Sequence, residues 1–210
     1  LTGGQRAISV ADGAAAIDLA LSAPLVNGGL TKSGLGTMQL TAGNSHTGPT
    51  TVSAGTLQVS HAAALGGSPV TIETGATLAV GSGITIRAPA VVVAGGTLSA
   101  STLAVNDTTG IRSLSINAGT LVGSPTVAIT TGGLLALAPD ARVTVPLGGL
   151  WIDQSPAGGK LDLGAGQVNL AAGGITAADL RADIIAGRNG GAWNGSTGIG
   201  SATAAAAGGT

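Results

Sequence analysis

A short motif recurs along this chain: a glycine, a small residue, and then an aliphatic–x–aliphatic stretch. Successive copies begin at glycines 36, 55, 75, 96 and 119, which are 19, 20, 21 and 23 residues apart. An internal period near twenty residues, with one short strand in each copy, is typical of stacked coils and not of a domain with a closed core. The repeat therefore predicts a β-solenoid.

The composition supports an ordered but unusual core. The 210 residues include 38 glycines, no Phe and no Tyr, so burial must come from thin layers of Val, Ile, Leu and Ala. Disorder would require low hydrophobicity or high net charge, whereas the mean hydropathy is +0.50 and the net charge is −1. An antiparallel sandwich would also give many short strands, but it need not repeat its sequence, so we favour the solenoid.

The arrangement of strands and turns divides the chain into two parts. Aliphatic segments of three to five residues, residues 84–86 among them, are bounded by Gly, Pro, Asn or Asp and are expected to be strands. We predict an all-β solenoid over residues 1–172 and a C-terminal capping or docking segment over 173–210. In that segment a helix is expected over 177–186, with Thr176 as N-cap and Gly187 as C-terminal cap, and an alanine-rich helical turn near 202–207.

One stretch resembles a known repeat family. Residues 29–40 (GLTKSGLGTMQL) are followed by Asn44, Gly48 and Val52 and then by residues 54–59 (AGTLQV). This order resembles the autotransporter-associated β-strand repeat, with Met38 in place of the usual Leu and His46 in place of the usual aromatic residue. The resemblance covers about residues 29–80, and residues 179–195 also look like the C-terminal part of surface proteins that carry the repeat. It implies a right-handed parallel β-helix in a secreted bacterial surface protein, and it carries no catalytic residues.

Charge and residue type exclude several classes of function. A net charge of −1 with scattered Lys and Arg argues against nucleic-acid binding, and no apolar run is long enough for an integral membrane segment. The chain has no cysteine, so disulfide and thiolate chemistry are excluded. Because it begins at Leu1, we expect a processed or excised piece, so any signal peptide would lie upstream of it.

Candidate chemical groups are few. His46 is expected to replace an aromatic residue at a turn and stack on the next turn of the solenoid, and His61 is expected on an exposed corner. Asp153 and Asp162 are the acidic pair of the late turns that could approach each other around calcium, but the glycine-rich calcium repeat is absent. We predict no metal, no cofactor and no catalytic residue. The remaining charges considered for a polysaccharide-active cleft are expected to be solvated corner residues: Glu73, Arg87, Asp107, Arg112, Asp140 and Arg142.

The function expected from these features is structural. We predict a non-enzymatic extracellular protein of the cell surface that assembles end to end with copies of itself into a filament or sheath. A stalk or passenger module of an adhesin that binds a host ligand or polysaccharide is the second interpretation, and a polysaccharide-active enzyme is the third. Trp151 is expected to pack between turns or against the C-terminal helix. Trp193 is expected either to be the more exposed tryptophan, available to a neighbouring subunit, or to fold back as a lid on the last turn. The candidate subunit contacts are Leu180, Ile184, Trp193, Ala204 and Ala207.

Overall fold

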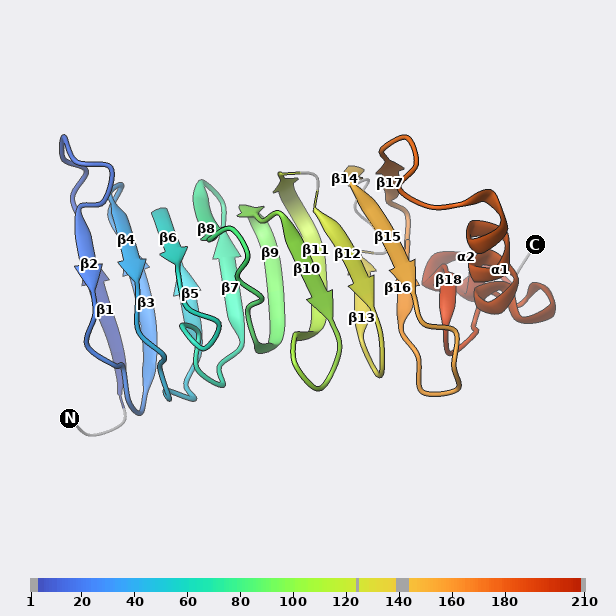
Figure 1. Cartoon of the computed structure of the whole chain (residues 1–210), viewed down its shortest axis with the longest axis horizontal. Helices are drawn as coiled ribbons and strands as arrows, with labels where there is room; N and C mark the ends of the chain where they lie inside the picture. The colour runs from blue at the N-terminus through green and yellow to red at the C-terminus, as the bar shows by residue number, and fades with distance from the viewer. Residues whose placement is uncertain (1–3, 124, 139–143, 209–210) are drawn as a thin grey trace.

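The protein is a rod built from parallel strands. A computed structural model describes residues 4–123, 125–138 and 144–208. Within them the chain forms a β-solenoid of about 7 turns, whose strands run across the long axis of the rod (Figure 1). The described N-terminal turn lies at one end, and the helices lie at the other. The predicted parallel solenoid with a short C-terminal helix is confirmed.

The longest ladder of strands runs the full length of the rod. Each of its strands pairs in parallel with the equivalent strand of the next turn. In order they are β1 (Gln5–Ser9), β3 (Gly29–Ser33), β5 (Thr50–Val52), β7 (Val70–Glu73), the first part of β9 (Ala88–Ser99) and of β11 (Ile111–Val122), β13 (Leu134–Leu137), β16 (Lys160–Asp162) and β18 (Gly198–Gly200). The strand β18 lies beyond residue 172, the predicted end of the solenoid, because the chain returns after its helix and adds one more strand.

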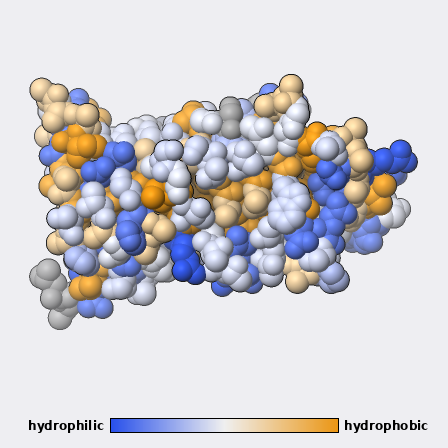
Figure 2. All heavy atoms as spheres, in the orientation of Figure 1, coloured by the Kyte–Doolittle hydropathy of each residue, from blue (hydrophilic) through white to orange (hydrophobic). Residues whose placement is uncertain are grey.

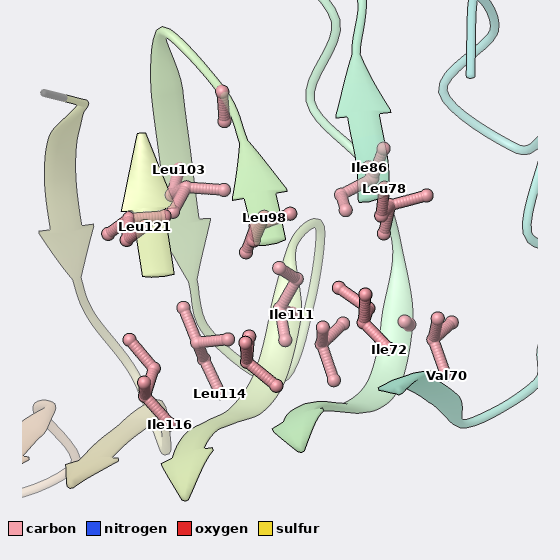
Figure 3. Packing of buried hydrophobic residues seen from close by; sticks show 14 of the residues in the cluster. Val70, Ile72, Leu78, Ile86, Leu98, Leu103, Ile111, Leu114, Ile116 and Leu121 are labelled. Atoms are coloured by element: carbon pink, nitrogen blue, oxygen red, sulfur yellow. The ribbon is translucent and has the colours of Figure 1, made fainter. Parts of the chain in front are cut away.

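A second ladder carries the repeated glycine motif. It consists of β2 (Leu19–Leu21), β4 (Thr37–Leu40), β6 (Gly55–Val59), β8 (Ala76–Val80) and the second parts of β9 and β11. Its register aligns Leu57, Leu78, Leu98 and Leu121, each at most 1% exposed. The aliphatic column predicted from the repeat is therefore confirmed. Figure 3 shows Leu78, Leu98 and Leu121 within the same buried cluster as residues of the first ladder.

The third side of the rod forms strands only in the later turns. These are β10 (Thr102–Val105), β12 (Thr126–Ile129) and β15 (Gly149–Ile152). A separate two-stranded sheet is formed by β14 (Thr144–Leu147) and β17 (Gln167–Leu170). The strand predicted over residues 84–86 is wrong: this segment is irregular backbone. The segment is hydrophobic for a different reason: Ile86 enters the core from a loop and is 2% exposed.

Helices cover the C-terminal end of the stack. They are α1 (Ala177–Arg188), the 3-10 turn η1 (Asn189–Gly191) and α2 (Ala202–Ala206). Thr176 is the N-cap of α1, as predicted, but the left-handed C-cap is Asn189 and not Gly187. Gly187 has another role. A Cβ atom there would lie 1.8 Å from the carbonyl oxygen of Ile199, so a glycine is required where α1 packs against β18.

Candidate functional site

The buried Lys32 stabilises the turn that follows it. It occupies an inward position filled by Val52 and Ile72 in the next two turns, and it is 0% exposed. Its Nζ donates hydrogen bonds to the carbonyl oxygens of Gly34, Gly36 and Ala54, at 2.6, 2.5 and 2.9 Å. Burial lowers the pKa of Lys32, and the charge of Asp18 opposes that shift. These contacts assign the lysine a structural role.

A second buried polar group surrounds His46. The imidazole is 1% exposed, and its Nε2 lies 2.9 Å from Thr50 Oγ1 and 3.3 Å from Ser68 Oγ. Burial, and then the charge of Arg6, lower its pKa. Its Nδ1 has no hydrogen-bond partner among the described residues. The sequence located this side chain at a turn between strands but did not reveal its two hydroxyl partners. His61, by contrast, is exposed as expected.

The predicted subunit contacts fall into two groups. Leu180, Ile184 and Trp193 line one cavity of ≈ 250 Å³ together with Ile199 and aliphatic residues of the last turns. Ala204 lies on α2, and Ala207 is the residue that ends it; neither lines that cavity. The first three residues therefore form one apolar pocket beneath the C-terminal helix.

The two tryptophans exchange the environments predicted for them. Trp151 is the exposed one, with 58% of its surface accessible, because its strand β15 directs Leu150 and Ile152 into the core. Trp193 is only partly exposed, since it lines the apolar cavity under α1. The expectation that Trp151 is packed was wrong, because alternation within β15 directs its side chain outward. For Trp193 the expectation of greater exposure was wrong, whereas the alternative that it folds back on the last turn agrees with its place in this cavity.

The scattered charges do not all lie together. Arg87, Asp107 and Arg112 line one cavity of ≈ 340 Å³, and Glu73 does not line it. Asp140 and Arg142 lie outside the described residues. Asp153 and Asp162 have separate partners: Asp153 accepts hydrogen bonds from Ser155, whereas Asp162 lies 4.0 Å from Lys160 and accepts from the Ala202 N–H.

A larger cavity, of ≈ 420 Å³, lies between β15, residues 173–176 and the start of α1. Its lining includes Trp151, Gln154 and three carboxylates, those of Asp153, Asp179 and Asp183. Asp183 is 2% exposed, and its Oδ1 accepts a hydrogen bond from Gln154 Nε2 at 2.8 Å. Burial raises the pKa of this carboxyl group, the bond from Gln154 lowers it, and the charge of Asp179 raises it. Over the described part of the chain, no group of three or more metal-ligating side chains is placed to hold a metal ion.

Comparison with known proteins identifies one segment. Residues 30–59 match the family model of the passenger-associated-transport-repeat, in agreement with the resemblance seen in the sequence. Comparisons with curated proteins and with solved structures gave no match. The matched segment runs from β3 to β6 and includes both Lys32 and His46. Together, the repeat and the solenoid fit a surface protein of the autotransporter passenger type, which is a secreted or surface bacterial protein. No helix in the described ranges is long and apolar enough to cross a membrane.

Proposed function

We propose that this protein is a non-enzymatic structural rod of a bacterial cell surface and that it associates end to end with copies of itself. The observation that carries the structural role is the continuous parallel ladder from β1 to β18, enclosing an aliphatic core within a chain that contains a passenger repeat. Each turn rests on its neighbours, so such a stack holds its two ends at a fixed separation.

The two ends of the rod support association between copies. At the first turn, β1 pairs within the described part of the chain with β3 alone. Ile8, whose equivalents in the next turns are buried, is only half-buried. An unpaired strand edge can accept another strand or an apolar surface. At the opposite end, Ile184 and Ile185 are 36% and 61% exposed. We propose that the apolar surface formed by Ile184 and Ile185 at the C-terminal end of one copy covers the first turn of the next.

A monomeric stalk module is the second candidate, and one observation favours it. The helix α1 packs against β18, and β18 in turn pairs with β16 of the same chain. The last turn is therefore already covered from within the molecule, which is the arrangement expected of a cap.

Sedimentation velocity over a range of protein concentrations, with electron microscopy of the same samples, separates the two candidates. We expect the wild-type mass to rise with concentration and rods to join at their ends. Ile8→Glu should remain folded but stay monomeric, because it puts a charge on the proposed contact. Thr77→Glu, at an outward position of a central strand, is the charge-matched control and should assemble normally. A wild-type protein that stays monomeric throughout would refute end-to-end association and leave the stalk module.

A further inference from the structure

The cavity between β15 and α1 combines an exposed aromatic ring with buried acceptors. Its volume of ≈ 420 Å³ lies within the range of small-molecule sites, roughly 300–1,000 Å³. It is formed where the edge of the solenoid meets the C-terminal helix, so its shape depends on elements far apart in the sequence.

Trp151 provides an accessible flat surface at this cavity. The parallel register places it beside Ala128, which in turn lies beside Ala104, and all three point outward from their strands. Because the side chains of the two alanines are short, they do not block access to the indole from that direction. The face of the rod seen in Figure 2 has hydrophobic residues near its middle, among more polar surroundings. An extended ligand could therefore contact the indole and continue along the rod.

The carboxylates differ in how many acceptor positions remain open. Both oxygens of Asp153 accept hydrogen bonds from Ser155, and Asp179 Oδ2 accepts one from Thr176 Oγ1 at 2.6 Å. Asp183 accepts a hydrogen bond from Gln154 Nε2 at its Oδ1, and its side chain is 2% exposed. Asp179 lies at an exposed position, so its carboxylate is the most accessible acceptor of the three.

The lining also restricts the class of ligand. It contains no Lys or Arg and three carboxylates, so an anionic ligand would be repelled. A wholly apolar ligand would shield these carboxylates from water without offering them a further hydrogen-bond donor. A divalent cation lacks a suitable set of ligands among the described side chains. A neutral saccharide suits the site, because the C–H face of a sugar ring packs on an indole and its hydroxyl groups donate to carboxylates.

We propose that this cavity binds a neutral saccharide, with one sugar ring on Trp151 and hydroxyl groups donating to Asp183 and Asp179. The proposal assumes that the rod is exposed at a cell surface, but it does not require self-association. The sugar would be a structural ligand of the rod, and no bond is made or broken in it.

Titration calorimetry and tryptophan fluorescence can test the site on the full chain. The probes are neutral hexasaccharides of glucose (α-1,4 and β-1,4 linked), mannose and N-acetylglucosamine, with hexagalacturonate and calcium chloride as charged alternatives. In the Trp193→Phe background, fluorescence reports Trp151 alone. We expect at least one neutral hexasaccharide to bind and to change this fluorescence, and hexagalacturonate and calcium to have no effect.

Substitutions then assign the contact residues. Trp151→Ala should weaken binding about tenfold or more. A tenfold loss of affinity corresponds to about 1.4 kcal/mol, which is the size of an aromatic ring contact. Asp183→Asn and Asp179→Asn should each weaken saccharide binding as well. Circular dichroism would show whether Asp183→Asn is folded. If that variant is not folded, Asp179→Asn, which changes an exposed position, provides the test. Leu35→Ala removes an exposed side chain far along the sequence and should bind normally. Failure of every neutral probe, unchanged affinity in Trp151→Ala, or preferential binding of the charged probes would overturn the proposal. Sedimentation results are independent of this outcome, so failure here leaves the proposed structural role unaffected.

Discussion

Replacing Lys32 by methionine should destabilise the N-terminal turns of the rod. Methionine has a similar length and fills the same space, but it cannot donate to the carbonyl oxygens of Gly34, Gly36 and Ala54. A buried acceptor left without a partner costs about 1–3 kcal/mol. The Gly36 oxygen keeps a longer bond, at 3.3 Å, from the Thr56 N–H. Removing the buried charge returns part of its desolvation cost. We therefore expect a net loss of about 2–4 kcal/mol.

Chemical unfolding followed by circular dichroism would measure this loss, and hydrogen exchange would locate it. Ile72→Met is the matched control, because Ile72 occupies the equivalent inward position two turns away. A volume-conserving exchange of this kind costs less than about 1.5 kcal/mol. In a solenoid each turn contacts only its neighbours, so exchange should accelerate around residues 30–59 and remain slow near Trp193. If Lys32→Met is as stable as wild type, desolvation of the ammonium outweighs its three hydrogen bonds and the reasoning is wrong.

Two further predictions concern the core. Leu78→Asp would place an unpaired charge at a position that is 0% exposed and should cost several kcal/mol or abolish folding; thermal unfolding of Leu78→Met provides the comparison, and equal melting temperatures would contradict the register. The lowered pKa of His46 means that the unfolded chain binds a proton more readily than the folded one, so stability should fall as the pH drops below the ordinary histidine value of about 6.5. Denaturation midpoints between pH 7 and 5 should decline in wild type and decline less in His46→Phe; parallel curves would exclude His46 as the cause.

The fold was predictable because its information is local and repeated. The glycine motif sets a period, and alternation within each copy decides which side chains face inward, so Leu57 and Leu78 could be aligned without a structure. The same logic misled for residues 84–86, where a hydrophobic pair belongs to a loop that reaches the core. The repeat period and the alternation of residues predict which side chains are buried, but they do not show whether a neighbouring strand is in position to pair with the segment.

The candidate site was much less predictable, because it depends on where the chain goes after the repeats end. Nothing in the local sequence around Trp151 shows that α1 and residues 173–176 line the same cavity as the indole. The role of Gly187 depends in the same way on the return of the chain to form β18. A clue for Asp183 was available, since an acidic residue between Leu180 and Ile184 lies close to the apolar face of a short helix.

The shared register of the second ladder also determines how such a rod can vary in length. Gly55 is paired with Ala76, and Thr56 with Thr77, so removing one segment between equivalent positions would join two strands that already present the same side chains to the core. Length would then change in steps of one turn, about 4.8 Å each, and the interior would remain continuous. An insertion of a single residue within a strand has no such solution, because it would turn every following inward side chain of that strand toward solvent; the unequal spacings of 19, 20, 21 and 23 residues are taken up between the strands. Copying or deleting whole turns can therefore adjust the length of this rod without disturbing its interior.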